Sequence, residues 1–112
     1  MMIIAVDFDG VICEHAFPDI GRENWSIIAW LIDRKKHGNK LILWTCRDSQ
    51  YLTEAIEWCK KRNLEFDAVN EDIDSVKDSD FGKGKSCKVY ADVYLDDRNI
   101  TPQSALLIGW LE

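Results

Sequence analysis

Acidic side chains and a hydroxyl group follow three apolar runs of this sequence. Asp7 and Asp9 follow the first run, Thr45 the second, and Asp96 and Asp97 the third. Oxygen ligands at this density suit Mg²⁺, which takes a few carboxylates together with water and phosphate oxygens. Crowded carboxylates repel one another, so a divalent cation would allow all of them to be ionised. A single Asp at a strand end is more often a cap or a turn residue, but the joint pattern favours a metal site.

The elements that would position these residues alternate between strand and helix. Apolar runs and helical spacing predict strands over 2–8, 40–45, 65–69 and 89–95, and helices over 24–37 and from Asp48 or Ser49 to Asn63. This alternation implies a parallel sheet with helices on both faces. Right-handed crossovers then bring the carboxyl ends of the strands to one edge, where ligands bind in open α/β sheets.

The spacing of apolar residues also predicts which side of each helix is buried. The stripes expected to face the core are Trp25, Ile28, Ala29 and Ile32 on the first helix, and Leu52, Ala55, Ile56 and Cys59 on the second. The five tryptophans are expected mostly at core positions. Residues 10–23 are predicted to be a loop, and residues 71–80 an acidic surface loop.

Length and composition limit the kind of protein. A chain of 112 residues allows a single domain, 1–112, with one hydrophobic core. The net charge of −6 argues against non-specific nucleic-acid binding but not against a small anionic substrate. No signal peptide, membrane span or C-x-x-C pair is found, so we expect a cytoplasmic protein with reduced thiols. Zinc at Cys13 and His15 is a weaker alternative, because nothing supplies the other half of a site.

Three segments resemble, in order, motifs of the haloacid dehalogenase (HAD) superfamily. Residues 7–12 (DFDGVI) resemble the first motif, D-x-D-G-x followed by Ile, Leu or Val. Residues 41–45 (LILWT) resemble the second, a hydrophobic strand that ends in Thr or Ser. Residues 93–98 (VYLDDR) resemble the fourth, a hydrophobic strand that ends in paired acids. The resemblance implies a minimal three-layer α/β/α Rossmann-like fold and a Mg²⁺-dependent phosphatase of phosphate monoesters.

The resemblance also implies roles for the acidic residues. Asp7 would be the nucleophile that forms an aspartyl-phosphate. Asp9 would protonate the leaving oxygen and then activate water. Mg²⁺ would be held by Asp7, the backbone carbonyl of Asp9 and the pair formed by Asp96 and Asp97. Asp97 is favoured as the direct ligand, with Asp96 binding directly or through water.

A second set of residues would hold the phosphate. Gly10 would let the backbone turn close to it. The Thr45 hydroxyl and nearby backbone N–H groups would bind a phosphoryl oxygen, with Cys46 among the substrate-binding positions. The third family motif is a single Lys, for which Lys88 is favoured and Lys85 is second. This ammonium would pair with the nucleophile and the phosphate.

Several residues keep open roles. Arg47 could contact the substrate phosphate or a second anionic group, or it could brace the following helix through Asp48. His15 and Glu14 lie in the loop where the family places a mobile flap, and His15 could touch substrate or be merely exposed. The run from 82 to 86 (GKGKS) ends like a phosphate-binding loop, but Ser79 replaces the required first Gly and no apolar strand precedes it, so we reject ATP binding there.

The intervals between the motifs leave no room for the cap domain that selects substrates in many HAD enzymes. We therefore expect an open site, covered by a second copy of the chain or by a large substrate, with self-association favoured. The loop 11–23, which carries Cys13, His15 and Phe17, would form part of this cover. The phosphorylated substrate is not identified by the sequence: nucleic acid is disfavoured by the charge, a phosphorylated nucleic-acid end stays open, and no membrane partner is expected.

Three other functions compete with a phosphatase. A receiver-like signalling module has a similar length, acidic cluster, Thr and Lys, but it places its paired acids after the first strand. A phosphotransferase would use the same aspartyl-phosphate with an acceptor other than water. An inactive regulatory protein on the same scaffold is disfavoured because Asp7 and Asp9 are both retained.

Overall fold

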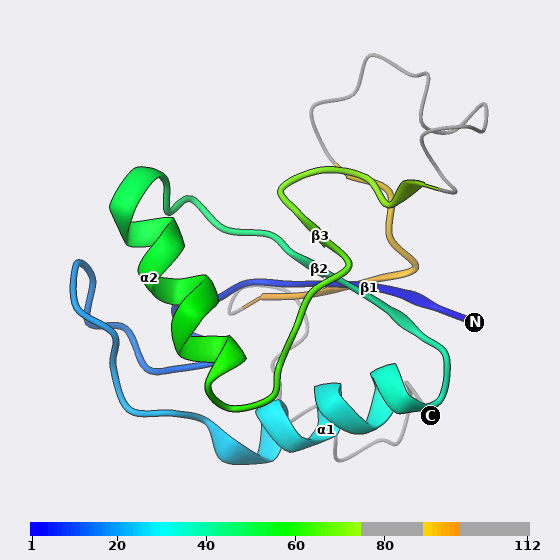
Figure 1. Ribbon diagram of the computed structural model, residues 1–112, viewed down its shortest axis with the longest axis horizontal. Helices are drawn as coiled ribbons and strands as arrows, with labels where there is room; N and C mark the ends of the chain where they lie inside the picture. The colour runs from blue at the N-terminus through cyan, green and yellow to red at the C-terminus, as the bar shows by residue number, and fades with distance from the viewer. Residues whose placement is uncertain (75–88, 97–112) are drawn as a thin grey trace.

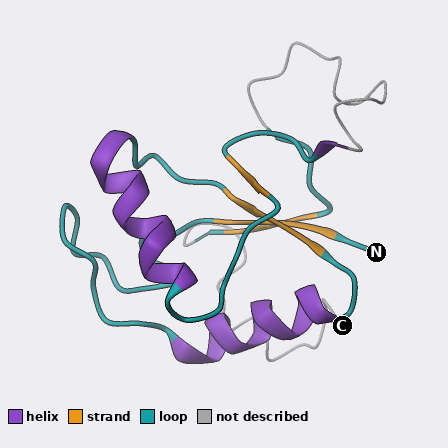
Figure 2. Cartoon of the chain, in the orientation of Figure 1, coloured by secondary structure: helices purple, strands orange, loops and turns teal. Residues whose placement is uncertain are grey.

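The computed structural model describes residues 1–74 and 89–96, and all structural statements below concern these residues (Figures 1 and 2). Its elements are β1 (Ile3–Val6), α1 (Trp25–Lys36), β2 (Lys40–Leu43), α2 (Ser49–Lys60), β3 (Ala68–Val69) and β4 (Val93–Leu95). The predicted alternation of strand and helix is confirmed. The strands are shorter than predicted because pairing covers only part of each apolar run. In β3 it is confined to two residue pairs, Ile42 with Ala68 and Leu43 with Val69.

The strands form a single parallel sheet in the order β3-β2-β1-β4. The first strand is therefore central, with β2 on one side and β4 on the other. Val6 is in register with Leu43 of β2 and Leu95 of β4. The residues that follow these three strands consequently lie together at the carboxyl-end edge of the sheet.

The side chains of the sheet divide between its two faces with the two-residue period of a strand. Ile4 and Val6 belong to the larger hydrophobic cluster, which includes the buried residues of both helices. Ile3 and Ala5 belong to a second cluster, which contains no residue of either helix. Both described helices thus cover one face, and the prediction of helices on both faces is not confirmed within the described residues. The physical reason is that two successive right-handed crossovers, β1 to β2 and β2 to β3, advance in the same direction and place their helices on the same side.

The second face is covered instead by segments on either side of residues 75–88. Ile73, Val89 and Ala91 are buried against it. The backbone N–H of Tyr90 donates to Asp72 Oδ1 at 2.6 Å. The predicted acidic surface loop is therefore wrong for Ile73, which belongs to the core, whereas Asp72 stays partly exposed and joins this segment to Tyr90.

The helices confirm one predicted stripe and correct the other. In α2, Ala55 and Cys59 are buried, and Leu52 and Ile56 pack against the core as expected. In α1 the buried residues are Ile27, Ile28 and Leu31, whereas Trp25 is 56% exposed and Ala29 is exposed. Of the four residues predicted for the α1 stripe, Ile28 is buried and Ile32 packs against the core, as expected. Trp25 and Ala29 were mispredicted because apolar residues occur on several sides of this helix, so its spacing alone does not fix which side is buried.

The tryptophans follow the same pattern. Trp30, Trp44 and Trp58 pack against the core as partly buried residues, Trp25 is exposed, and Trp110 lies outside the described residues. Two predicted helix ends are confirmed. The chain leaves α1 through Gly38 at φ +90° and leaves α2 through Asn63 at φ 66°, both in the left-handed conformation that commonly ends helices.

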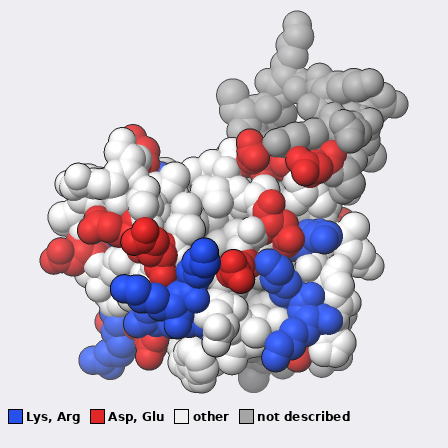
Figure 3. Space-filling view, in the orientation of Figure 1, with Lys and Arg blue, Asp and Glu red and all other residues white. Residues whose placement is uncertain are grey.

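Basic side chains gather at the carboxyl ends of both helices. Arg34, Lys35 and Lys36 lie in the last turn of α1, and Lys60 lies in the last turn of α2. Figure 3 shows Lys and Arg over these helix ends, where the helix dipole favours positive charge. Within the described part of the chain, no helix has the length and apolar character needed to cross a membrane.

Candidate active site

The sheet brings the predicted nucleophile and one predicted metal ligand to adjacent strand ends. The backbone N–H of Asp7 donates to the carbonyl of Leu95 at 3.0 Å, so the pairing of β1 with β4 continues to the last residue of β4. Asp7 and Asp96 then follow these neighbouring strands, and both are half-buried. One carboxylate oxygen of Asp7 accepts the N–H of Phe8 at 2.8 Å, which fixes the orientation of this side chain.

Asp9 is held by an arginine from the next strand end. Arg47 donates from Nε to Asp9 Oδ2 and from Nη2 to Asp9 Oδ1, both at 2.8 Å. Such a two-pronged ion pair is the strongest hydrogen-bonded arrangement available to a carboxylate. The Arg47 side chain is 1% exposed and that of Asp9 17%. The hydrogen bond to Asp9 raises the pKa of the Arg47 guanidinium.

Arg47 has partners that the sequence did not suggest. The guanidinium also donates to the carbonyls of Asp19 at 2.8 Å and Pro18 at 3.4 Å. These hydrogen bonds join it to Asp9 and to the segment 18–19 rather than to Asp48, and its contact with a substrate phosphate stays a prediction. Asp48 does precede α2, but no side-chain hydrogen bond caps the helix there.

Gly10 occupies a position that no other residue would fit without strain. Its φ is +90°, and a Cβ at this position would lie 2.4 Å from Nε2 of His15. The imidazole of His15 thus lies directly against the turn that follows Asp9. Sequence alone left His15 either as a substrate contact or as an exposed loop residue. The structure shows an exposed side chain packed on the site backbone.

The segment after Gly10 is a loop whose two ends are joined by backbone pairing. Cys13 pairs with Glu23 in an antiparallel bridge, and the Glu14 N–H donates to the Arg22 carbonyl at 2.9 Å. We call residues 14–22 the flap. It extends from the site as the blue loop at the left of Figure 1. Its Phe17 ring contacts the ring of Tyr51 on α2, with ring centres 5.3 Å apart.

Thr45 lies two residues beyond β2 and is held on both sides. Its N–H donates to Oδ1 of Asn70 at 2.8 Å, and its hydroxyl oxygen accepts the N–H of Arg47 at 3.1 Å. A hydroxyl that accepts one hydrogen bond still has its proton to donate, for example to a phosphoryl oxygen. Cys46, which lies between Thr45 and Arg47 in the sequence, is exposed.

Three predicted site residues lie outside the described residues: Lys85, Lys88 and Asp97. The choice between Lys88 and Lys85, and that between Asp96 and Asp97 as the direct ligand, therefore stay predictions. Within residues 1–74 and 89–96, no three His, Cys, Asp or Glu side chains are grouped closely enough to hold a metal ion. The donors present nevertheless fit Mg²⁺, because this ion commonly takes one or two carboxylates and fills its other positions with water and phosphate oxygens.

Two of the described cysteines are buried. Burial raises the pKa of Cys13 to about 11 and that of Cys59 to about 12. These thiols are therefore protonated at neutral pH. Cys13, Cys46 and Cys59 are free thiols, and zinc at Cys13 and His15 stays the weaker prediction.

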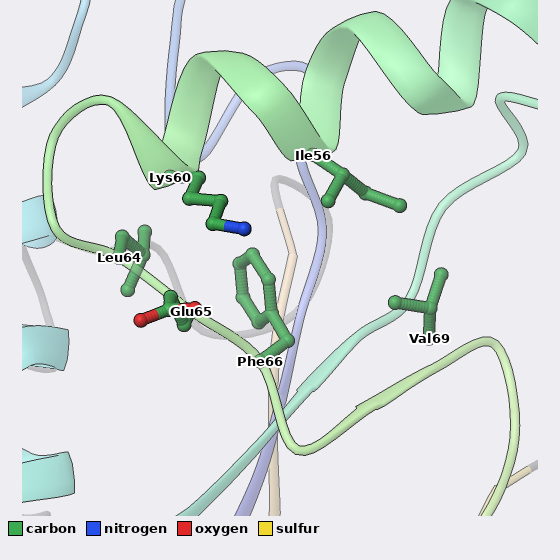
Figure 4. A pocket seen from close by; sticks show the side chains of 6 residues that line it. All are labelled: Ile56, Lys60, Leu64, Glu65, Phe66 and Val69. Carbon is green, nitrogen blue, oxygen red and sulfur yellow. The ribbon is translucent and has the colours of Figure 1, made fainter.

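Among the described residues, one hollow lies away from the acidic edge and another lies beside Gly10. One of about 150 Å³ lies between α2 and the segment leading into β3, where Figure 4 shows Ile56 and Lys60 facing the Phe66 ring. Another of about 250 Å³ lies at the base of the flap, beside Gly10, Cys13 and Arg22. The second hollow thus adjoins Gly10, one of the positions predicted to lie close to the phosphate.

Sequence reasoning missed two contributors to this edge. The pairing of Arg47 with Asp9 could have been suspected from a basic residue at the strand end beside D-x-D, but not distinguished from a substrate contact. Asn70 follows β3 with φ 54° and supports Thr45. An Asn at a strand end is a weak signal of such a role, since Asn commonly adopts this conformation in turns.

The fold and the strand-end residues define an α/β protein with an acidic site at the carboxyl edge of a parallel sheet. No family model matches the chain, and no curated protein matches it. A solved structure of a conserved protein from Bacteroides thetaiotaomicron is 39% identical, and the alignment covers 99% of this chain and 93% of that one with a TM-score of 0.74. The chain belongs to the same family as this protein.

Proposed function

We propose that this protein is a Mg²⁺-dependent phosphohydrolase of the HAD type that cleaves phosphate monoesters through an aspartyl-phosphate on Asp7. The observation that supports this most is the placement of Asp7 on the central strand, between its two neighbours. Asp96 follows β4 on one side and Thr45 follows β2 on the other. The nucleophile would thus lie between a metal ligand and a phosphate-binding hydroxyl.

In the first step, a carboxylate oxygen of Asp7 attacks phosphorus. The new bond joins this oxygen to phosphorus, and the bond from phosphorus to the ester oxygen breaks. The departing oxygen takes a proton from Asp9 and leaves as an alcohol. Thr45 donates its hydroxyl proton to a non-bridging oxygen, and Lys88 pairs with the phosphoryl charge.

In the second step, Asp9 takes a proton from water as the water oxygen attacks phosphorus. The bond between phosphorus and Asp7 breaks, inorganic phosphate leaves, and the carboxylate of Asp7 and the proton on Asp9 are both restored. The two steps together consume one ester and one water. Capture of the phosphoryl group by another acceptor in this step would make the same site a phosphotransferase.

Asp7, Asp96, Asp97 and the backbone carbonyl of Asp9 are the residues that would hold Mg²⁺. The bound ion would supply charge stabilisation for the phosphoryl oxygens. The chain itself contributes orientation, because the N–H of Phe8 holds one oxygen of Asp7 and Arg47 holds both oxygens of Asp9.

The proposal includes the finer features expected from the resemblance: a three-layer arrangement, the lack of a cap domain and a cytoplasmic location. An open edge cannot exclude water by closing a domain over a small substrate. A second copy of the chain would supply this cover, with the flap at the interface.

A screen of phosphorylated sugars, nucleotides, phosphorylated oligonucleotide ends and aryl phosphates, with Mg²⁺, tests the proposal. We expect phosphate release that requires Mg²⁺ and is lost in Asp7→Asn. Asp67→Asn is the matched control, because Asp67 lies at the opposite end of the sheet and accepts the N–H of Leu41. Equal rates in the wild type and Asp7→Asn would contradict the proposed function.

A further inference from the structure

Arg47 has more partners than a simple ion pair requires. Beyond its two hydrogen bonds to Asp9, it donates to the main-chain carbonyls of Asp19 and Pro18 in the flap. These contacts connect residues that are far apart in the sequence. A single guanidinium therefore joins the end of β2, the turn after β1 and the flap.

The flat faces of this guanidinium are covered as well. It lies 5.0 Å from the ring centre of Phe8 and 5.1 Å from that of Phe17. Phe8 is fully buried in the core, whereas Phe17 is a flap residue that is 58% exposed. Arg47 thus lies over a core ring and a flap ring together, a cation–π contact that Arg makes more often than Lys.

We propose that Arg47 is a positioning residue that couples the seating of the flap to the orientation of the Asp9 carboxylate. This inference rests on the proposed function for the role of Asp9 as acid and base. A buried ion pair is by itself weak evidence for stability, because desolvation offsets much of the attraction. Here the same side chain also binds the flap through two carbonyls and a ring, and this second set of contacts points to a coupling role.

The geometry leaves Asp9 able to react. A carboxylate offers about four lone-pair positions, and the arginine fork uses one on each oxygen. Asp9 keeps some exposure, with 17% of its side chain accessible. Arg47 would therefore set the direction of the remaining lone pairs without occupying them. A substrate that presses on the flap would act on Asp9 through Arg47.

The variant Arg47→Lys tests this coupling. Lysine keeps the charge but cannot donate to both carboxylate oxygens and the flap carbonyls at once. The matched control is Arg62→Lys, since Arg62 also pairs with a carboxylate, that of Glu23 at 2.6 Å, and stacks on a ring, that of Trp58 at 3.7 Å. It touches neither Asp9 nor the flap residues 17–19.

Two probes separate coupling from general damage. Phenyl phosphate has a poor leaving group that needs a proton from Asp9, and 4-nitrophenyl phosphate has a better one that needs it less. We expect Arg47→Lys to lower kcat about 100-fold on phenyl phosphate, the loss typical of a displaced catalytic group, and much less on 4-nitrophenyl phosphate. Arg62→Lys should keep the wild-type ratio between the two esters. Equal losses of Arg47→Lys on both esters would overturn the inference.

Hydrogen exchange of the flap amides gives a readout that does not depend on activity. We expect the Glu14 amide, which is bonded to Arg22 across the base of the flap, to exchange faster in Arg47→Lys but not in Arg62→Lys. Phe17→Ala should change the exchange rate of the flap amides and the ratio of kcat between the two esters in the same direction as Arg47→Lys, but less strongly. This second variant keeps the test available if Arg47→Lys does not fold. If the flap amides exchange at the wild-type rate in both Arg47→Lys and Phe17→Ala, the coupling is refuted. If the wild-type protein hydrolyses neither of these esters and none of the phosphorylated compounds in the screen, the proposed function is refuted instead.

Discussion

Aspartates lie at both ends of this parallel sheet, but their surroundings differ. At the amino end, Asp92 accepts the N–H of Ile3 at 2.7 Å, and Asp67 accepts the N–H of Leu41 at 2.8 Å. At the carboxyl end, Asp7 and Asp96 follow adjacent strands, and Asp9 is paired with Arg47. The first pair closes the backbone hydrogen bonding of the sheet, whereas the second group concentrates negative charge.

The difference follows from the polarity of parallel strands. Their amino ends present N–H groups without a partner, and a carboxylate beside one of them completes a hydrogen bond. Their carboxyl ends present carbonyl oxygens, which repel a carboxylate. Acids placed there need cations, which in this protein are the guanidinium of Arg47 and, in the proposed function, Mg²⁺ and a lysine. Whether an Asp lies at the amino or the carboxyl end of a parallel strand therefore says more about its role than the presence of the Asp alone.

The largest expected effect separates the two ends by activity. Asp7→Asn should lower kcat by at least roughly 1,000-fold, because the amide oxygen is a poor nucleophile, while the similar shape keeps the fold. Asp67→Asn at the amino end should leave kcat close to the wild-type value. Steady-state kinetics on 4-nitrophenyl phosphate, with circular dichroism of both variants, checks this. Comparable losses in the two variants would remove the functional distinction between the ends.

The next effect separates the two aspartates of the first motif. Asp9→Asn should lower kcat on phenyl phosphate by about 10²- to 10⁴-fold, the range of general acid–base catalysis. The loss on 4-nitrophenyl phosphate should be clearly smaller, since 4-nitrophenol leaves more readily without a proton. Rates on both esters, measured for the same preparation, decide the point. A loss independent of the leaving group would assign Asp9 to binding rather than to proton transfer.

At the amino end the expected effect is on stability. Asp92→Ala removes the partner of the Ile3 N–H in a part-buried hydrogen bond and should lower the free energy of unfolding by about 0.5–1.5 kcal/mol. Activity under folding conditions should stay close to that of the wild type. Urea denaturation measures the change, and Asp33→Ala, which alters an exposed carboxylate on α1, is the control. Loss of activity in a fully folded Asp92→Ala would place function at both ends of the sheet.

Thiol reactivity gives the smallest effect and compares the carboxyl edge with the buried base of the flap. At pH 8, in a Cys87→Ser background, a thiol reagent should label the exposed Cys46 first. The pKa of Cys13, raised from 9.0 to about 11 by burial, leaves about 100-fold less thiolate than an ordinary Cys has. Mass spectrometry of the labelled peptides measures the order. Early labelling of Cys13 would show that the base of the flap is open.

The raised pKa of Cys13 also determines the direction in which the free energy of unfolding changes with pH. The folded state holds the Cys13 proton more tightly than the unfolded state does. The protonated thiol therefore contributes fully to the free energy of unfolding below pH about 9, and this contribution is lost as the pH rises toward about 11. Denaturation midpoints should therefore fall over this interval, and less so in Cys13→Ala. A midpoint that rises between these pH values would contradict the burial of this thiol.

Local patterns predicted much of the fold. The buried strands, the α2 stripe and the helix ends at Gly38 and Asn63 follow from the spacing of apolar residues and from turn residues, which act over a few positions. The buried side of α1 did not follow, because apolar residues such as Trp25 and Ile27 lie on different sides of the helix and only packing against the sheet selects between them. Ile73 was missed for a related reason, since a single apolar residue in an acidic stretch carries no period.

The candidate site was predictable only as a set of neighbours. Parallel strands bring their carboxyl ends together, so the proximity of Asp7, Thr45 and Asp96 follows from the order of the elements. Partner choice does not follow from it. Whether Arg47 meets Asp9, Asp48 or a ligand depends on side-chain geometry over several ångströms, and the support of Thr45 by Asn70 depends on one backbone conformation.

The central claim is that Asp7 carries the phosphoryl group, and chemical trapping tests it most directly. The protein is mixed with Mg²⁺ and 4-nitrophenyl phosphate, quenched in acid within one turnover, and reduced with borohydride, which converts an aspartyl-phosphate into homoserine. Peptide mass spectrometry then locates the changed residue. We expect homoserine at position 7 in the wild type and none in Asp7→Asn. Hydrolysis without any modified residue, or modification at Asp9 or Asp96 instead, would contradict it.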